Sequence, residues 1–160
     1  EMKSTGEAIG YDSSLTRALY KALRSSGMDV ANYGTLFATI ADVDKEKALP
    51  LIRRFYNLGF NIEGTKGTAE FLRQNGIRTR YRAKLSEGSD EIFTALRQGH
   101  INYVINTMDI SQGDSTRDGY EIRRCAVENN VSIFTSLETV QVLLDVLEEI
   151  TLGVSTIDAE

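Results

Sequence analysis

A short segment rich in glycine and threonine, Gly64-Thr65-Lys66-Gly67-Thr68, carries the residue types that bind anions. It follows a predicted strand and leads directly into a predicted helix. Glycines let backbone N–H groups approach an anion, and the N-terminus of a helix favours negative charge. The segment is too short to count as a dinucleotide or triphosphate fingerprint. Taken alone, it fits a simple helix cap as well as it fits a ligand-binding loop.

Further basic and polar residues come directly after the other predicted strands. They are Lys45, Lys84, Asn106 with Thr107, and Thr135 with Ser136. Each lysine, taken singly, would be an ordinary surface residue. In a parallel sheet, however, ligands bind outside the carboxyl ends of the strands, which lie at one edge. We therefore predict that these groups gather around a small molecule that carries a phosphate.

Other residues with chemical potential have simpler interpretations. Cys125 fits the apolar pattern of a helix, so we expect it in the core. His100, the only histidine, follows a glycine in a predicted turn and is expected at the surface, and one histidine with one cysteine predicts no metal site. Asp109, Asp114 and Asp118 come in or after one loop, where they would face water, accept a sugar hydroxyl or act as a base.

Alternating strands and helices are predicted to position these groups. Short β-branched and aromatic runs predict strands at residues 35–40, 60–63, 78–82, 103–106 and 131–134, and apolar spacing predicts helices between them and at both ends, from residue 13 and from residue 137. Gly59, Gly76 and Gly99 stand where helices should end. The expected fold is α/β and doubly wound, with a mainly parallel five-stranded sheet and helices on both faces.

The segment after the first strand contains two features that affect where its helix begins. Asp42 or Asp44 can cap the helix. Pro50 lies inside the apolar pattern of that helix and would remove a hydrogen bond, at a cost of roughly 3 kcal/mol. We therefore expect the helix to start late or to kink at Pro50.

Composition limits the classes of function. The 160 residues are 41% apolar and carry 23 acidic and 18 basic side chains, a net charge of −5. This predicts a single domain over residues 11–152 that binds no nucleic acid, and no apolar run is long enough to predict a membrane partner. One cysteine predicts a reducing, cytoplasmic location. Because the chain opens on glutamate, we expect a fragment of a longer protein, with tails at residues 1–10 and 153–160.

Five motifs in order resemble one family. They are MKSTGE at 2–7, GTKGTA at 64–69, KLSEG at 84–88, INT at 105–107 and DGYEIRR at 118–124. Together they resemble the C-terminal allosteric domain of the carbamoyl phosphate synthetase large subunit, which has the methylglyoxal synthase-like fold. The resemblance covers nearly the whole chain, and it implies that residues 1–10 are the end of the preceding synthetase domain or a linker. It implies an effector-binding domain for regulators such as UMP, IMP or ornithine.

The resemblance also implies roles for individual residues. The nucleotide-phosphate contacts match Lys45, Thr65, Thr68, Lys84 and Asn106, with Lys66 and Gly67 in the same loop, Thr107 beside it, and Asp118 near the sugar or base. Thr135 matches an ornithine contact. Ile133 stands where the ornithine-responsive relative has tyrosine, and the remaining contacts come from a neighbouring synthetase domain. We therefore expect negligible ornithine binding by this chain alone.

In the whole enzyme that the resemblance implies, carbamoyl phosphate is made from bicarbonate, glutamine and ATP. ATP and divalent metal would bind the synthetase domains of the same parent chain, which would also assemble with a small glutaminase subunit. This domain would need no cofactor and hold no catalytic residue. Ser89-Asp90 stands where the family commonly has Arg-Pro, so one basic contact is lost.

The alternative is a freestanding lyase like methylglyoxal synthase, which eliminates phosphate from dihydroxyacetone phosphate. This enzyme uses aspartates and histidines for proton transfer. Its Gly-Gly-Asp segment is not found after Thr68, and His100 is the only imidazole. The sequence therefore favours the regulatory domain.

Overall fold

The computed structural model describes residues 31–107 and 113–152, together with Ala18 and Lys21. Both predicted terminal segments lie outside the described part. Of the helix predicted from residue 13, only Ala18 and Lys21 are described. The elements are β1 (Thr35–Ile40), η2 (Asp42–Asp44), α2 (Lys45–Asn57), β2 (Asn61–Gly64), α3 (Lys66–Gln74), β3 (Thr79–Tyr81), η3 (Leu85–Glu87), α4 (Glu91–Arg97), β4 (Tyr103–Thr107), α5 (Gly113–Glu128), β5 (Ser132–Phe134) and α6 (Leu137–Leu152).

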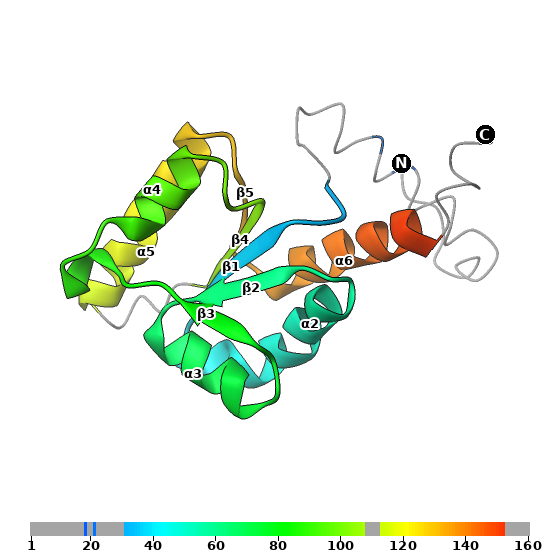
Figure 1. The fold of residues 1–160 in the computed structure, drawn as a ribbon, viewed down its shortest axis with the longest axis horizontal. Coiled ribbons are helices and arrows are strands. Elements are labelled where there is room, and N and C mark those ends of the chain that lie inside the picture. The colour runs from blue at the N-terminus through cyan, green and yellow to red at the C-terminus, as the bar shows by residue number, and fades with distance from the viewer. Residues whose placement is uncertain (1–17, 19–20, 22–30, 108–112, 153–160) are drawn as a thin grey trace.

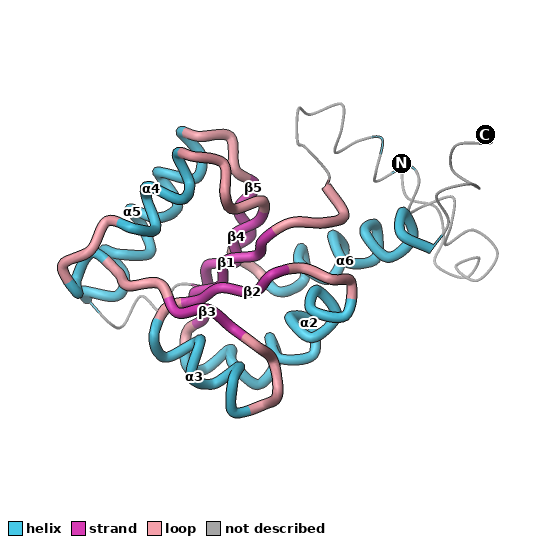
Figure 2. The backbone as a smooth tube through the Cα atoms, viewed as in Figure 1, coloured by secondary structure: helices cyan, strands magenta, loops and turns pink. Residues whose placement is uncertain are grey.

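The five strands form one parallel sheet in the order β3-β2-β1-β4-β5. Helices α2, α3 and α6 lie on one face and α4 and α5 on the other (Figure 1). The tube view in Figure 2 shows the strands running through the centre between these two groups. The predicted fold class is therefore confirmed. Because β1 pairs with both β2 and β4, the order of the strands reverses between β1 and β4, which is where ligands bind in such sheets.

Alternate residues of β1 supply the two halves of the core. Leu36 and Ala38 pack with the apolar sides of α2, α3 and α6, whereas Phe37 faces α4 and α5. Cys125 of α5 is 8% exposed and belongs to the second cluster, so its predicted place in the core is confirmed. Burial raises the pKa of its thiol.

An aromatic cluster fills the centre of the larger half. The rings of Phe55 and Phe60 meet edge to face with centroids 5.2 Å apart, and Tyr103 lies 6.3 Å from Phe55 and 5.9 Å from Phe60. The Tyr103 hydroxyl donates a hydrogen bond of 2.6 Å to the Ala31 carbonyl. This cluster joins α2 to β4 through contacts between buried rings.

Three glycines end helices as predicted. Gly59, Gly76 and Gly99 have φ of +99°, +82° and +75°, a conformation that favours glycine. After α2, the N–H of Phe60 donates to the Phe55 carbonyl at 3.1 Å, which is the Schellman pattern. The surface position predicted for His100, directly after the third glycine, is also confirmed.

The start of α2 differs from the prediction. The helix begins at Lys45, five residues before Pro50, so a late start is wrong. Pro50 is exposed, and the one carbonyl that loses its donor, that of Glu46, belongs to an exposed residue that water can reach. Asp44 occupies the N-cap position without a side-chain hydrogen bond to the helix, and Asp42 pairs with Lys45 instead. Asp44 therefore takes the predicted N-cap position, but its side chain does not make the capping hydrogen bond.

A second ionic contact ties α2 to α6. The guanidinium of Arg54 donates to both oxygens of Glu148, at 2.9 and 2.7 Å, and to Asp145 at 2.9 Å. Hydrogen bonding to Arg54 lowers the pKa of the Glu148 carboxyl. In the described part of the chain, no helix is both long enough and apolar enough to cross a bilayer.

Candidate functional site

The first turn of α3 lies at the carboxyl end of β2. Thr65 occupies its N-cap position with extended backbone, but its hydroxyl makes no cap hydrogen bond to the helix. That hydroxyl lies 3.4 Å from the hydroxyls of both Thr39 and Thr68 instead. The threonine therefore does not serve as the side-chain cap that the sequence left open. The N–H groups at a helix start need a partner from outside the helix, and an anion can supply it.

Lys45 reaches from α2 to this turn. A Cβ atom added to Gly67 would lie 3.3 Å from Lys45 Nζ, so the ammonium group lies directly over the glycine. The Lys45 side chain is 17% exposed and forms an ion pair with Asp42. A positive charge and a helix N-terminus thus share one small region.

Gly64 allows a close approach between the Gly64–Thr68 segment and β1. A Cβ atom there would lie 3.0 Å from the carbonyl oxygen of Ala38 on the neighbouring strand. The absence of a side chain lets the Gly64–Thr68 segment turn closely against β1.

Two buried threonine hydroxyls accept hydrogen bonds from backbone N–H groups at the end of β1. The Ile40 N–H donates to Thr68 Oγ1 at 3.0 Å, and the Ala41 N–H donates to Thr107 Oγ1 at 2.9 Å. Each hydroxyl accepts one backbone hydrogen bond and retains its own proton for donation. The two residues therefore fix the switch point between β1 and its neighbours.

Asn106, the other predicted contact on β4, is 2% exposed. Its Nδ2 donates to the Gly119 carbonyl at 2.7 Å, so the side chain ties β4 to α5. The sequence did not indicate this structural role. Asp118 is part of α5, but its side chain lies outside the described residues, as do those of Asp109 and Asp114.

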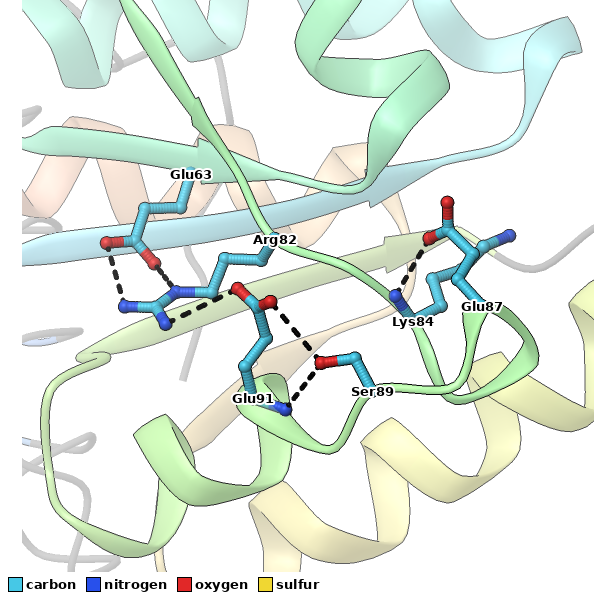
Figure 3. A network of polar contacts seen from close by, with 6 residues as sticks. All are labelled: Glu63, Arg82, Lys84, Glu87, Ser89 and Glu91. Atoms are coloured by element: carbon cyan, nitrogen blue, oxygen red, sulfur yellow. Dashed lines mark hydrogen bonds and ion pairs between the residues drawn. The ribbon is translucent and has the colours of Figure 1, made fainter.

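Lys84 lies beyond β3 and is held through Glu87 (Figure 3). The backbone N–H of Lys84 donates to Glu87 Oε1 at 2.9 Å, and the Tyr81 hydroxyl donates to Glu87 Oε2 at 2.8 Å. The hydrogen bond from the Lys84 N–H is the main reason that the pKa of Glu87 is lowered, and the charges of Lys84 and Lys66 act in the same direction. The charges of both lysines therefore act on one carboxylate at this edge.

Two of the predicted residues line a cavity farther along the carboxyl edge of the sheet. Thr107 and Thr135 both line a cavity of about 520 Å³ between the N-terminal ends of α2 and α6, with Lys47 and Gln141 on its walls. The structure thus divides the predicted set into an α3 region and a β4–β5 region. In the described residues, no group of three or more histidine, cysteine or acidic side chains is arranged to hold a metal ion.

The buried ion pair of Glu63 and Arg82 was not among the residues predicted from the sequence. Glu63 stands in a strand between buried residues, which is an unusual place for a carboxylate unless it is paired. That pattern was the available signal, but the partner follows from the pairing of β2 with β3.

The model of one protein family, the MGS-like domain, matches residues 47–135, more than half of the chain. The matched segment runs from the first turn of α2 through β5 and includes the start of α3 and Lys84. The parallel sheet and the order of its strands agree with this match. The chain therefore belongs to the MGS-like domain family.

Proposed function

We propose that this chain is a regulatory domain that binds the phosphate of a nucleotide such as UMP or IMP at the carboxyl edge of its sheet. The observation that carries the proposal is the placement of the Lys45 ammonium over Gly67, at the first turn of α3. The pKa of Glu87 is lowered mainly by the hydrogen bond from the Lys84 N–H, and the positive charges of Lys84 and Lys66 also act on that carboxylate. An incoming phosphate would meet positive charge together with N–H groups of the helix N-terminus.

Binding requires a rearrangement of existing ion pairs. Lys45 is paired with Asp42, so a phosphate has to replace or join that carboxylate. Asp42 is 76% exposed, and an exposed carboxylate rehydrates readily when its partner turns away. A phosphate that contacts both the ammonium and the helix N–H groups makes more charge-assisted hydrogen bonds than Asp42 does.

In our proposal the chain itself performs no catalysis. Its parent would be a carbamoyl phosphate synthetase large subunit, whose synthetase domains bind ATP and metal and assemble with a small glutaminase subunit. Control would arise because the effector binds one conformation of the parent better than another. The resemblance of five sequence motifs to that enzyme supports this choice of parent.

A panel of ligands in a thermal shift experiment tests the proposed effector class. The ligands are UMP, IMP, pyrophosphorylated ribose phosphate, inorganic phosphate, ornithine and uridine. A ligand at 100 times its dissociation constant stabilises the folded state by about 2.7 kcal/mol. We expect the phosphorylated compounds to raise the melting temperature and ornithine and uridine to leave it unchanged. A shift with ornithine alone, or with none of the phosphates, would contradict the proposal.

Turnover of dihydroxyacetone phosphate separates this proposal from the lyase alternative. A lyase with this fold would bind the same phosphate and release it after abstracting a proton. We expect no release of phosphate by the purified chain above the uncatalysed rate. Saturable release that disappears in Asp118→Asn would establish the lyase instead.

Replacing Gly67 by alanine is expected to change stability and binding in opposite directions. Alanine within a helix is favoured over glycine by up to about 1 kcal/mol, and in the described part of the chain the atom that a Cβ would meet is the flexible end of Lys45. The added methyl group would occupy the space between the ammonium and the helix N–H groups. Denaturation should show equal or higher stability, and calorimetry should show UMP binding weakened by roughly tenfold, which is about 1.4 kcal/mol. Unchanged binding would place the phosphate elsewhere.

A further inference from the structure

A buried ion pair lies next to two segments of the candidate site, namely Gly64–Thr68 and the segment after β3 that contains Lys84. Arg82 Nε donates to Glu63 Oε1, and its Nη2 lies 3.4 Å from Glu63 Oε2 (Figure 3). Each side chain is only 10% exposed. Glu63 comes one residue before the Gly64–Thr68 segment, and Arg82 comes two residues before Lys84. The pair therefore joins the bases of the two segments that would hold the phosphate.

The main chain makes the same connection. The backbone N–H of Arg82 donates to the Gly64 carbonyl at 2.9 Å, just beyond the last residue of β3. Arg82 is thus held to β2 through both its backbone and its side chain. These two contacts therefore both hold Arg82 in place relative to the first turn of α3.

The contacts continue to the other end of the Lys84 segment. Arg82 Nη1 lies 3.8 Å from Glu91 Oε1, and Ser89 Oγ donates to Glu91 Oε2 at 3.3 Å and accepts from the Glu91 N–H at 3.2 Å. Between these ends, the Lys84 carbonyl accepts hydrogen bonds from the N–H groups of Glu87 and Ser89, at 3.0 and 3.2 Å. The backbone of Lys84 is therefore held between two anchored ends.

Stability alone does not account for a pair of this kind. Two buried charges lose their hydration, and apolar residues of similar volume often give equal or greater stability. What the pair supplies is a fixed geometry. We propose that Arg82 is a positioning residue for Lys84, and that Glu63, Arg82 and Glu91 form a clamp that sets the distance from Lys84 to the first turn of α3.

This inference rests on the proposed function, because it concerns how the phosphate site is organised. Binding costs less when the groups that contact the ligand are already ordered. With the clamp in place, the Lys84 backbone needs no further ordering when phosphate arrives. Without it, Lys84 would be present but no longer held at the right distance from Gly67.

The test removes both buried charges together, in the double variant Glu63→Leu/Arg82→Met, so that neither charge is left unpaired. Thermal unfolding establishes that the variant is folded. We expect its affinity for UMP to fall by roughly tenfold or more. Adding Lys84→Ala to the double variant should then cost less than about threefold, because an unclamped lysine contributes little. Uridine binding should not change.

Arg54→Met is the matched control, since it removes another multiply bonded arginine, one that ties α2 to α6. It should lower stability while leaving UMP affinity within about twofold and the effect of Lys84→Ala intact. If Arg82 had a merely structural role, the double variant would also lose stability while keeping its UMP affinity and the full effect of Lys84→Ala. That outcome, or full additivity with Lys84→Ala, would overturn the clamp.

Hydrogen exchange tests the clamp without any ligand. In the double variant, amides of residues 83–90 should exchange roughly tenfold faster or more, while those of α2 and α6 stay unchanged. Exchange that matches the unmodified chain over residues 83–90 would overturn the inference. If the unmodified chain binds none of the phosphates but residues 83–90 loosen in the variant, the proposed function fails and the clamp stands as a purely conformational element.

Discussion

Replacing Lys84 by alanine is expected to weaken binding of UMP or IMP by roughly 10- to 150-fold. A hydrogen bond to a charged group contributes about 1.5–3 kcal/mol, and about 1.4 kcal/mol corresponds to a factor of ten in affinity. The fold should survive, because Lys84 lies beyond β3 and belongs to neither apolar cluster. Calorimetry of the variant with each nucleotide measures the effect.

Two controls make this result specific to the phosphate. Uridine and inosine should bind far more weakly than the nucleotides, and the mutation should hardly affect them, because they lack the group that Lys84 meets. Lys47→Ala removes the same charge from α2, next to the cavity lined by Thr107 and Thr135. It should leave UMP affinity within about twofold, as expected for an exposed charge without direct contact. If Lys84→Ala gives no larger change than Lys47→Ala, Lys84 is an ordinary surface lysine.

Replacing Phe55 by alanine is expected to lower the free energy of unfolding by roughly 3–5 kcal/mol, the usual cost of removing a buried aromatic ring. Phe55 is fully buried and contacts the rings of Phe60 and Tyr103, so the cavity would open at the centre of the larger cluster. Urea denaturation followed by circular dichroism measures the change. A loss below about 1 kcal/mol would show that the core rearranges to fill the space.

The adjacent residue provides the matched control. Tyr56 lies on the same helix and is 36% exposed. Tyr56→Ala should cost much less, within about 1 kcal/mol, because most surface substitutions change stability little. Similar losses in the two variants would mean that the cost of Phe55→Ala does not come from burial in the aromatic cluster.

Local patterns predicted most of the fold, because each strand and helix of the sheet carries its own periodicity. Gly59, Gly76 and Gly99 were informative because a positive φ strongly favours glycine. The start of α2 was predicted less well. The prediction counted the hydrogen bond that Pro50 removes but not the exposure of Glu46, whose freed carbonyl water can reach.

The candidate site was predictable to the extent that it depends on topology. Parallel strands bring Lys45, Thr65 and Lys84 to one edge, whatever the details of packing. The approach of Lys45 to Gly67 and the use of Asn106 to hold α5 depend on side-chain directions between elements distant in sequence. The ion pair of Glu63 and Arg82 depends on β2 lying beside β3, and strand order was not part of the prediction. Binding of a nucleotide stays a prediction.

The most direct test of the central proposal locates the bound phosphate. The 160-residue chain, labelled with ¹⁵N, is titrated with inorganic phosphate and with UMP while backbone amide resonances are followed. We predict the largest shifts at Lys66, Gly67 and Thr68, whose N–H groups lie at the start of α3, with smaller shifts at Lys45 and Lys84. Shifts confined to the cavity lined by Thr107 and Thr135, or no saturable shifts at all, would contradict it.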